Sequence, residues 1–264
     1  LYLGRFEEGW KAFETRWHMG TLKQRVCAAP RWQGEEISGK TLLVYEEQGF
    51  GDSILCSRYL PLIHARGGKV VLECKKPLHR LFAGLPGVTA LAELGQYQGE
   101  VDFHIPMMSL PGLFKTDLSS VPAPHRFDVP DRPPALAQHL FGLAKGRLKV
   151  GIVWSGSTTF QNNHKRAVSI ERFLPLAEVP GVQLYSLQKG PHEKDLEAHG
   201  ALGIIHDLAP CLNDFADTAS VVKNLDLIIM TDSSVAHLAG TMSRPVWNLL
   251  GSRPYWLCLQ ERTD

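Results

Sequence analysis

The chain has 264 residues, which is enough for one large domain or two of ordinary size. Its hydrophobic share of 44% and charged share of 21% are typical of a soluble globular protein. The net charge is +1, from 28 basic and 27 acidic residues, so the overall charge does not favour nucleic acid as a partner.

The cysteines and the apolar runs restrict the compartment. The five cysteines are odd in number and widely spaced, which argues against a disulfide framework and a zinc site and predicts a cytoplasmic protein. No apolar run is long enough to predict a transmembrane segment, and no signal peptide is recognisable. The chain begins at Leu1 rather than Met and stops abruptly after Asp264, so we expect a piece of a longer protein.

The first block, residues 1–30, is predicted to be helical. Trp10, Phe13 and Trp17 are spaced i, i+3 and i+7, which places them on one face of a helix. So short a segment cannot bury two tryptophans alone, and we expect it to pack on the domain that comes after it in the chain.

Residues 31–134 are predicted to form the first α/β domain. Strands are expected at 41–45, 69–74, 88–91 and 102–105, with a helix at 52–66 despite Pro61. A stretch rich in serine and proline, residues 117–134, then marks a linker.

Residues 135–264 are predicted to form the second α/β domain. Its strands are expected at 148–154, 182–187, 203–206, 225–231 and 246–250, and its helices at 169–178, 193–200, 214–223 and 235–242. Such alternation predicts parallel sheets with helices on both faces. The fold class is therefore α/β, with two Rossmann-like domains facing a cleft.

The most informative motif comes directly after the strand at 225–231. Asp232, Ser233 and Ser234 form a small polar turn before a helix, at the place where open α/β sheets bind ligands. The first N–H groups of a helix lack intrahelical partners and suit an anion, above all a phosphate. The alternative is that these side chains only cap the helix. His237, inside this helix, is by itself more typical of a packed residue than of a catalyst.

Two further turns of the second domain share this position. Trp154, Ser155 and Gly156 come at the end of the first strand, and Lys165 and Arg166 come shortly after and could neutralise a diphosphate. Gln188 ends the next strand, where a base or ribose is often bound. Solvated loops with ordinary surface charges are the alternative.

In the first domain the strand at 41–45 runs into Glu46–Asp52, which contains Gln48, Gly49 and Gly51. The glycines allow the backbone to approach a ligand closely. Asp52 suits either a helix cap or a general base. A nicotinamide dinucleotide site is a weaker alternative, because the third glycine is missing although Glu73 lies at a suitable distance. No nucleophilic triad or metal-ligand spacing is evident.

Together these residues resemble the heptosyltransferase-like glycosyltransferases, and more closely the glycosyltransferase half of bacterial tetratricopeptide-repeat glycosyltransferases. The segments that carry the resemblance are GRFEEGWKAFETRW, EEQGFGD, RYLPLI, SLQKG, DFADTA and TDSSVAHLAG. The first of them is similar to the tail of a repeat array.

The resemblance implies a GT-B fold and an inverting, metal-independent transfer from a nucleotide-sugar, with no cofactor. It implies that Asp52 is the base for an acceptor hydroxyl and that Arg166 meets the diphosphate. The donor loop would comprise Asp232, Ser233, Ser234 and His237. For some members it implies protein acceptors such as flagellin, chosen by the repeats. The alternative from another class is a catalytically silent nucleotide-binding or scaffold module.

Overall fold

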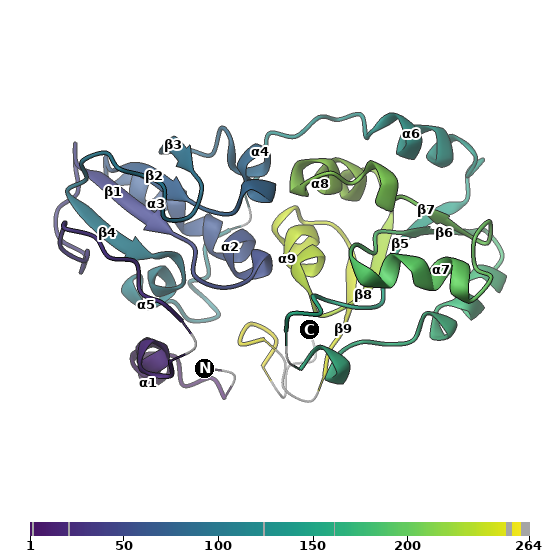
Figure 1. Cartoon of the computed structure of the whole chain (residues 1–264), viewed down its shortest axis with the longest axis horizontal. Helices are drawn as coiled ribbons and strands as arrows, with labels where there is room; N and C mark the ends of the chain where they lie inside the picture. The colour runs from purple at the N-terminus through teal and green to yellow at the C-terminus, as the bar shows by residue number, and fades with distance from the viewer. Residues whose placement is uncertain (2, 21, 124, 161, 252–254, 260–264) are drawn as a thin grey trace. The chain divides into compact units, whose positions relative to one another are not determined.

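The computed structural model describes residues 1, 3–20, 22–123, 125–160, 162–251 and 255–259. The chain divides into two compact units, residues 1–128 together with 253–264, and residues 129–252. Each unit contains one parallel sheet with helices packed on it (Figure 1).

The sheet of the first unit is built from four strands, β1 (Thr41–Tyr45), β2 (Lys69–Glu73), β3 (Val88–Ala92) and β4 (Phe103–Pro106). Their order is β3-β2-β1-β4, and every pair is parallel. The apolar run of β1 is buried from its second residue on, as expected of a strand covered on both faces.

The helices of the first unit are short: α2 (Phe50–Cys56), α3 (Leu60–Ala65), α4 (His79–Phe82) and α5 (Leu110–Leu113). The single helix expected over 52–66 is broken by a 3₁₀ turn, Ser57–Tyr59. Pro61 explains the break, because its ring excludes a continuous α-helical ladder through the preceding turn and proline is tolerated in the first turn of α3.

The predicted N-terminal helix is present as α1 (Phe6–Phe13), followed by a 3₁₀ turn, Glu14–His18. Trp10 is buried, and its indole N–H donates to the Thr116 carbonyl at 2.6 Å. Its ring meets the Trp256 ring edge to face at 5.0 Å between centroids. The helix therefore packs on the first unit, as expected.

An ionic cluster joins this N-terminal segment to the sheet of the first unit. It comprises Glu14, Arg16, Arg31, Glu47 and Ser109. The guanidinium of Arg16 is buried and donates to Glu47 at 2.8 Å and to Ser109 at 2.8 Å. Burial raises the pKa of Glu47 to about 7, although Arg16 opposes the shift.

The sheet of the second unit has five strands, β5 (Leu148–Val153), β6 (Val182–Ser186), β7 (Ile205–Asp207), β8 (Leu227–Thr231) and β9 (Val246–Leu249). All pairs are parallel, in the order β7-β6-β5-β8-β9. All nine strands expected from the sequence are thus confirmed, with ends that differ by at most two residues.

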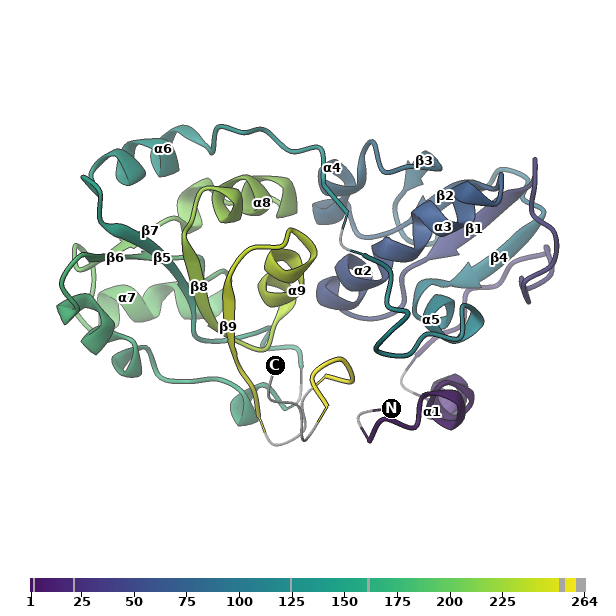
Figure 2. The same ribbon diagram turned by 180° about the vertical axis from the view of Figure 1, so that it is seen from behind.

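The helices of the second unit are α6 (Ala135–Gly142), α7 (Asp195–Ala198), α8 (Phe215–Lys223) and α9 (Ser234–Thr241). Seen from behind, α8 and α9 lie side by side against the sheet (Figure 2). The helix expected over 169–178 consists of two 3₁₀ segments, Ile170–Arg172 and Leu174–Glu178, the second of which contains a proline in its first turn.

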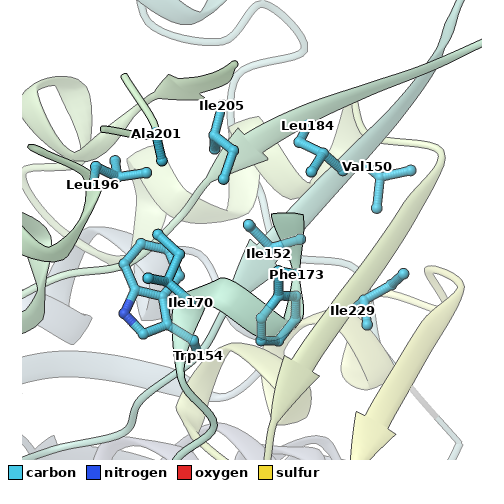
Figure 3. Close-up of a cluster of buried hydrophobic side chains, with 10 residues drawn as sticks. All are labelled: Val150, Ile152, Trp154, Ile170, Phe173, Leu184, Leu196, Ala201, Ile205 and Ile229. Atoms are coloured by element: carbon cyan, nitrogen blue, oxygen red, sulfur yellow. The ribbon is translucent and has the colours of Figure 1, made fainter. Parts of the chain in front are cut away.

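A core of apolar side chains fills one face of this sheet (Figure 3). Trp154 and Ile170 lie on the side of the cluster where Leu196 of α7 packs, and Ile152 lies next to Phe173. The core anchors the end of β5, and the turn after β5 therefore starts from a fixed point.

The two compact units differ from the predicted domain limits in two places. The division falls after Asp128 rather than after residue 134, and residues 253–264 group with the first unit rather than with the second. Of that terminal stretch, residues 255–259 are described, and Trp256 explains the grouping because it is buried against α1. The separation of residues 1–30 as a domain of their own stays a prediction.

Two further features concern the cysteines and the lengths of the described helices. None of the five cysteines, all of which lie in the described part of the chain, forms a disulfide. The helices of the described ranges are all too short or too polar to cross a bilayer.

Candidate functional site

The strand orders identify where each unit can bind a ligand. In the second unit the chain starts at β5, adds β6 and β7 on one side, and then returns to add β8 and β9 on the other. The order reverses between β5 and β8, and ligands of open α/β sheets bind beyond the carboxyl ends of strands at such a point. In the first unit the same reversal falls between β1 and β4. The predicted loops after β5, β8 and β1 therefore lie at these two switch points.

The turn after β8 begins α9 without a cap. Ser233 occupies the N-cap position in an extended conformation, but no capping hydrogen bond of its side chain is found among the described residues. By contrast, α8 is capped by Asp214, whose carboxylate accepts from the N–H groups of Ala216 at 2.9 Å and Asp217 at 3.0 Å. A side-chain cap is also absent at other described helices, such as α1 and α6, so the free start of α9 leaves room for an anion but does not by itself point to one.

Two polar residues surround this turn. Asp232 is half-buried and accepts a long hydrogen bond, 3.5 Å, from the Asn248 amide on β9. The Thr231 hydroxyl is fully buried and lacks a hydrogen-bond partner within the described ranges. A buried polar atom without a partner is uncommon. The Thr231 hydroxyl therefore adds an unused hydrogen-bonding group at the carboxyl end of β8.

The turn after β5 is braced by Asn163. The Asn163 amide oxygen accepts from the Gly156 N–H at 3.1 Å and from Arg166 at 3.2 Å, and its amide nitrogen donates to the Ser155 hydroxyl at 2.9 Å. The Arg166 guanidinium also lies over the Phe160 ring, 4.4 Å from the centroid. These contacts hold an arginine against the backbone of the turn.

Gly156 is required by that packing. A Cβ at this position would lie 2.5 Å from Nη2 of Arg166 and 2.9 Å from Oδ1 of Asn163. Because no real Cβ comes so close, a larger residue would displace the guanidinium. The glycine therefore allows the arginine to lie close to the backbone of this turn.

Gln188 has a different role from the one expected. It is buried, and its amide oxygen accepts from the N–H groups of Trp154 at 3.1 Å and Ser155 at 2.9 Å. Its amide nitrogen donates to the carbonyls of Ser155 and Lys189, both at 3.0 Å. All four hydrogen-bonding positions of the amide are used. A direct contact with a base or ribose would have to break one of these bonds, and in this structure Gln188 joins the turns after β5 and β6.

Trp154, also expected at the donor, contributes to the core, and its contact with a donor stays a prediction. Its ring is buried in the core, and its indole N–H donates to the Asp195 carboxylate at 3.0 Å. Lys165 is exposed, with its carbonyl near Gly251 after β9. His237 is half-buried in the first turn of α9. Contacts of Lys165 and His237 with a donor stay predictions.

The turn after β1 begins α2 with a capping box. Asp52 accepts the Gly49 N–H on Oδ2 at 3.0 Å, so the capping role considered for Asp52 is present. Its other oxygen, Oδ1, accepts from the Tyr255 hydroxyl at 3.1 Å. The Gln48 carbonyl is held by the Lys75 ammonium at 2.7 Å, and Gly51 lies in the first turn of α2.

A cavity of about 120 Å³ opens beside Asp52 within the first unit. Its polar wall contains Gln48, Asp52 and Tyr255, and aromatic side chains of α1 and Trp256 form much of the rest. The carboxylate therefore faces a space that a small group such as a hydroxyl could enter.

Sequence reasoning missed two residues of these sites. The sequence places Asn163 only in a polar loop, and the signal that could have found it is an amide next to a glycine turn and a basic pair. Tyr255 is 203 residues away from Asp52 in the chain, and nothing in the local sequence pairs them.

The alternative of a nicotinamide dinucleotide site depended on Glu73 as the acidic residue that would bind the ribose. Glu73 is fully buried and accepts from Arg25 at 2.6 and 2.8 Å and from the N–H groups of Gly95 and Tyr97. Its carboxylate is occupied by the protein and is not available to a ribose. Within the described ranges no group of three or more histidine, cysteine or acidic side chains is arranged to hold a metal ion.

The fold is that of the heptosyltransferase-like glycosyltransferases, as the resemblance implied. A family 9 glycosyltransferase from Veillonella parvula matches with a TM-score of 0.62 at 15% identity, over 83% of this chain and 86% of that one. The ADP-heptose lipopolysaccharide heptosyltransferase II of E. coli gives a TM-score of 0.58 at 13% identity, over 79% and 84%. The dodecameric, iron-containing heptosyltransferase TibC in complex with ADP-D-β-D-heptose gives 0.56 at 10% identity, over 86% and 66%.

The sequence comparison adds one relative. Protein FlbA of Caulobacter vibrioides is 28% identical over 281 residues, which cover 96% of this chain. The match takes in 46% of FlbA, so this chain spans slightly less than half the length of that curated relative. No protein-family model matches the sequence.

Proposed function

We propose that this chain is the catalytic half of an inverting, metal-independent glycosyltransferase that moves a sugar from a nucleotide-sugar to an acceptor hydroxyl. The observation that carries the proposal is the uncapped start of α9 at the switch point of the second sheet, next to the turn that Asn163 and Arg166 brace. Two proteins of the same fold, heptosyltransferase II and TibC, are described with ADP-heptose, which supports a nucleotide-sugar as the donor here.

In this mechanism the donor diphosphate binds the N–H groups of Ser233 and Ser234 and the guanidinium of Arg166. As the bond from the sugar to the diphosphate breaks, negative charge grows on the leaving phosphate. An arginine and a helix N-terminus can both stabilise that charge without reorganising. They supply positive charge where other transferases use a cation, and this supports the metal-independent form of the reaction.

Asp52 is proposed as the general base. As the acceptor oxygen attacks the anomeric carbon, its proton passes to the Asp52 carboxylate, and attack from the face opposite the leaving group inverts the configuration. For this step the first and second units must face each other across a cleft. The N-terminal helix α1 is proposed to be the end of a tetratricopeptide array that presents a protein acceptor such as flagellin.

The proposed location is the cytoplasm, because five cysteines without a disulfide are typical of a reducing compartment. The competing function is a catalytically silent scaffold attached to repeats. A scaffold does not need to bind a nucleotide at the α9 turn, whereas a glycosyltransferase does. A measurement of nucleotide binding, which needs no acceptor, therefore distinguishes the two functions.

The first experiment is a thermal-shift and calorimetric screen of nucleoside diphosphates and nucleotide-sugars. A ligand that binds only the folded protein raises its melting temperature. Arg166→Gln should weaken binding roughly ten- to a hundredfold, because a hydrogen bond to a charged group is worth about 1.5–3 kcal/mol. Arg172→Gln, which changes an exposed arginine of the same unit, is the matched control. Binding of no nucleoside diphosphate would favour the scaffold.

The second experiment measures nucleotide release and the anomeric configuration of the product, with and without a chelator. Asp52→Asn is informative because the amide oxygen of asparagine can still accept the Gly49 N–H and keep the helix start. We expect a loss of turnover with little loss of donor binding. Turnover of Asp52→Asn at the wild-type rate would refute the assignment of Asp52 as the general base. Loss of wild-type activity on addition of a chelator would refute the metal-independent mechanism.

A further inference from the structure

The Asp52 carboxylate is held from two sides, and only one of them is local. The Gly49 N–H belongs to the same turn and completes the capping box. The Tyr255 hydroxyl donates to the other oxygen from a segment 203 residues later in the chain. Helix capping needs the first contact but not the second, so the second calls for its own explanation.

The segment that carries Tyr255 is anchored by aromatic packing. Trp256 is buried, and its ring meets those of Trp10 at 5.0 Å and Phe6 at 6.0 Å, both edge to face. A turn closes behind it, in which the Cys258 N–H donates to the Tyr255 carbonyl at 2.9 Å. The tyrosine is therefore fixed by its own neighbours and does not depend on Asp52 for its place.

The hydroxyl of Tyr255 remains a donor over the working pH range. Burial, and then the charge of Asp52, raise the pKa of Tyr255 well above its ordinary value. A neutral tyrosine next to a carboxylate can only donate to it. Each carboxylate oxygen accepts more than one hydrogen bond, so both Asp52 oxygens keep a position for an incoming hydroxyl.

We propose, on the basis of the function proposed above for Asp52, that Tyr255 is a positioning residue for the base. Its hydroxyl fixes the rotation of the carboxylate about the Cβ–Cγ bond, with an unused acceptor position of the carboxylate facing the cavity. The acceptor proton passes to Asp52, and Tyr255 keeps its own proton throughout. A carboxylate held only at Oδ2 by Gly49 would turn more freely and meet the acceptor less often.

The test uses Tyr255→Phe, which keeps the ring and removes the hydroxyl. We expect kcat to fall roughly ten- to a hundredfold at an unchanged KM for the donor, as for a misplaced catalytic group. A purely structural role would instead lower the fraction of folded protein and leave the kcat of the folded fraction unchanged. Tyr59→Phe is the matched control, since it removes a buried tyrosine hydroxyl of the same unit that donates to Thr116 at 2.8 Å, and it should leave kcat unchanged.

A measurement without turnover separates this inference from the proposed function. The carboxyl ¹³C resonance of Asp52, identified by its loss in Asp52→Asn, can be compared at one pH in the wild-type protein, in Tyr255→Phe and in Tyr59→Phe. A changed chemical shift in Tyr255→Phe alone supports the contact even when no donor or acceptor is turned over. An unchanged chemical shift, or wild-type kcat in Tyr255→Phe, overturns the positioning role.

Discussion

Replacing Gln188 by methionine tests the role that the structure gives this residue. Methionine has nearly the same length but cannot form the four hydrogen bonds of the amide, which are 2.9–3.1 Å long. Each is worth about 1 kcal/mol net, and two buried N–H groups would be left without a partner. We therefore expect the free energy of unfolding to fall by about 4 kcal/mol.

Urea denaturation followed by tryptophan fluorescence measures this loss, with Gln183→Met as the control. Gln183 is also buried, but its side chain donates a longer hydrogen bond, 3.4 Å, to the Ile204 carbonyl, so its variant should lose about 1 kcal/mol or less. A Gln188→Met protein that is as stable as the wild type but binds nucleotide poorly would refute the reasoning. Gln188 would then be the direct ligand that the sequence suggested.

Three further predictions concern the turns and the pH dependence. Gly156→Ala should weaken nucleoside diphosphate binding by about tenfold or more, because its Cβ would displace Arg166, and calorimetry measures the change. Asp214→Ala should cost about 1 kcal/mol of stability through loss of a cap, whereas Ser233→Ala should cost less than about 0.5 kcal/mol. Burial lowers the pKa of His125 from 6.5 to about 4, so the unfolded chain takes up the proton first as the pH falls. Stability should drop by at most about 3 kcal/mol between pH 6.5 and pH 4, and His125→Phe should remove that part of the slope.

Each of these has a control or a contrary outcome. Gly240→Ala changes an exposed glycine of α9 with nothing within 4 Å of the added Cβ, and it should leave binding unchanged. A Ser233→Ala variant that loses as much stability as Asp214→Ala would mean that the serine caps α9 after all. An acid-induced loss of stability that is the same with phenylalanine at position 125 would assign the slope to other groups.

The strands were predictable because their signal is local. The apolar runs of the central strands, such as Leu42–Tyr45, become buried strands covered on both faces, whereas the edge strands β3 and β9 stay partly exposed. The helices were harder to predict than the strands, because Pro61 and Pro175 turn parts of two expected helices into 3₁₀ segments. The switch-point loops could be located from strand ends alone, which is why the predicted site residues fall there.

Which side chains are free to bind a ligand could not be predicted from the sequence. Gln188 and Asp52 both lie in turns at strand ends. The Gln188 amide, however, accepts from backbone N–H groups 33 and 34 residues away, and the Asp52 carboxylate accepts from a hydroxyl 203 residues later in the chain. A side chain's remaining hydrogen-bonding capacity depends on which distant segments reach it. Sequence gives the type of group, whereas the three-dimensional structure decides which groups are still available to a ligand.

The ionic cluster around Arg16 determines how the N-terminal helix could be exchanged. Removal of the first thirty residues would leave Glu47 buried without its cation, and breaking a buried pair from one side typically costs about 3–5 kcal/mol. A chimera in which another segment replaces α1 must therefore keep Glu14 and Arg16. The junction for such a replacement lies ahead of residue 14, between α1 and the ionic cluster, and not at the start of the first sheet.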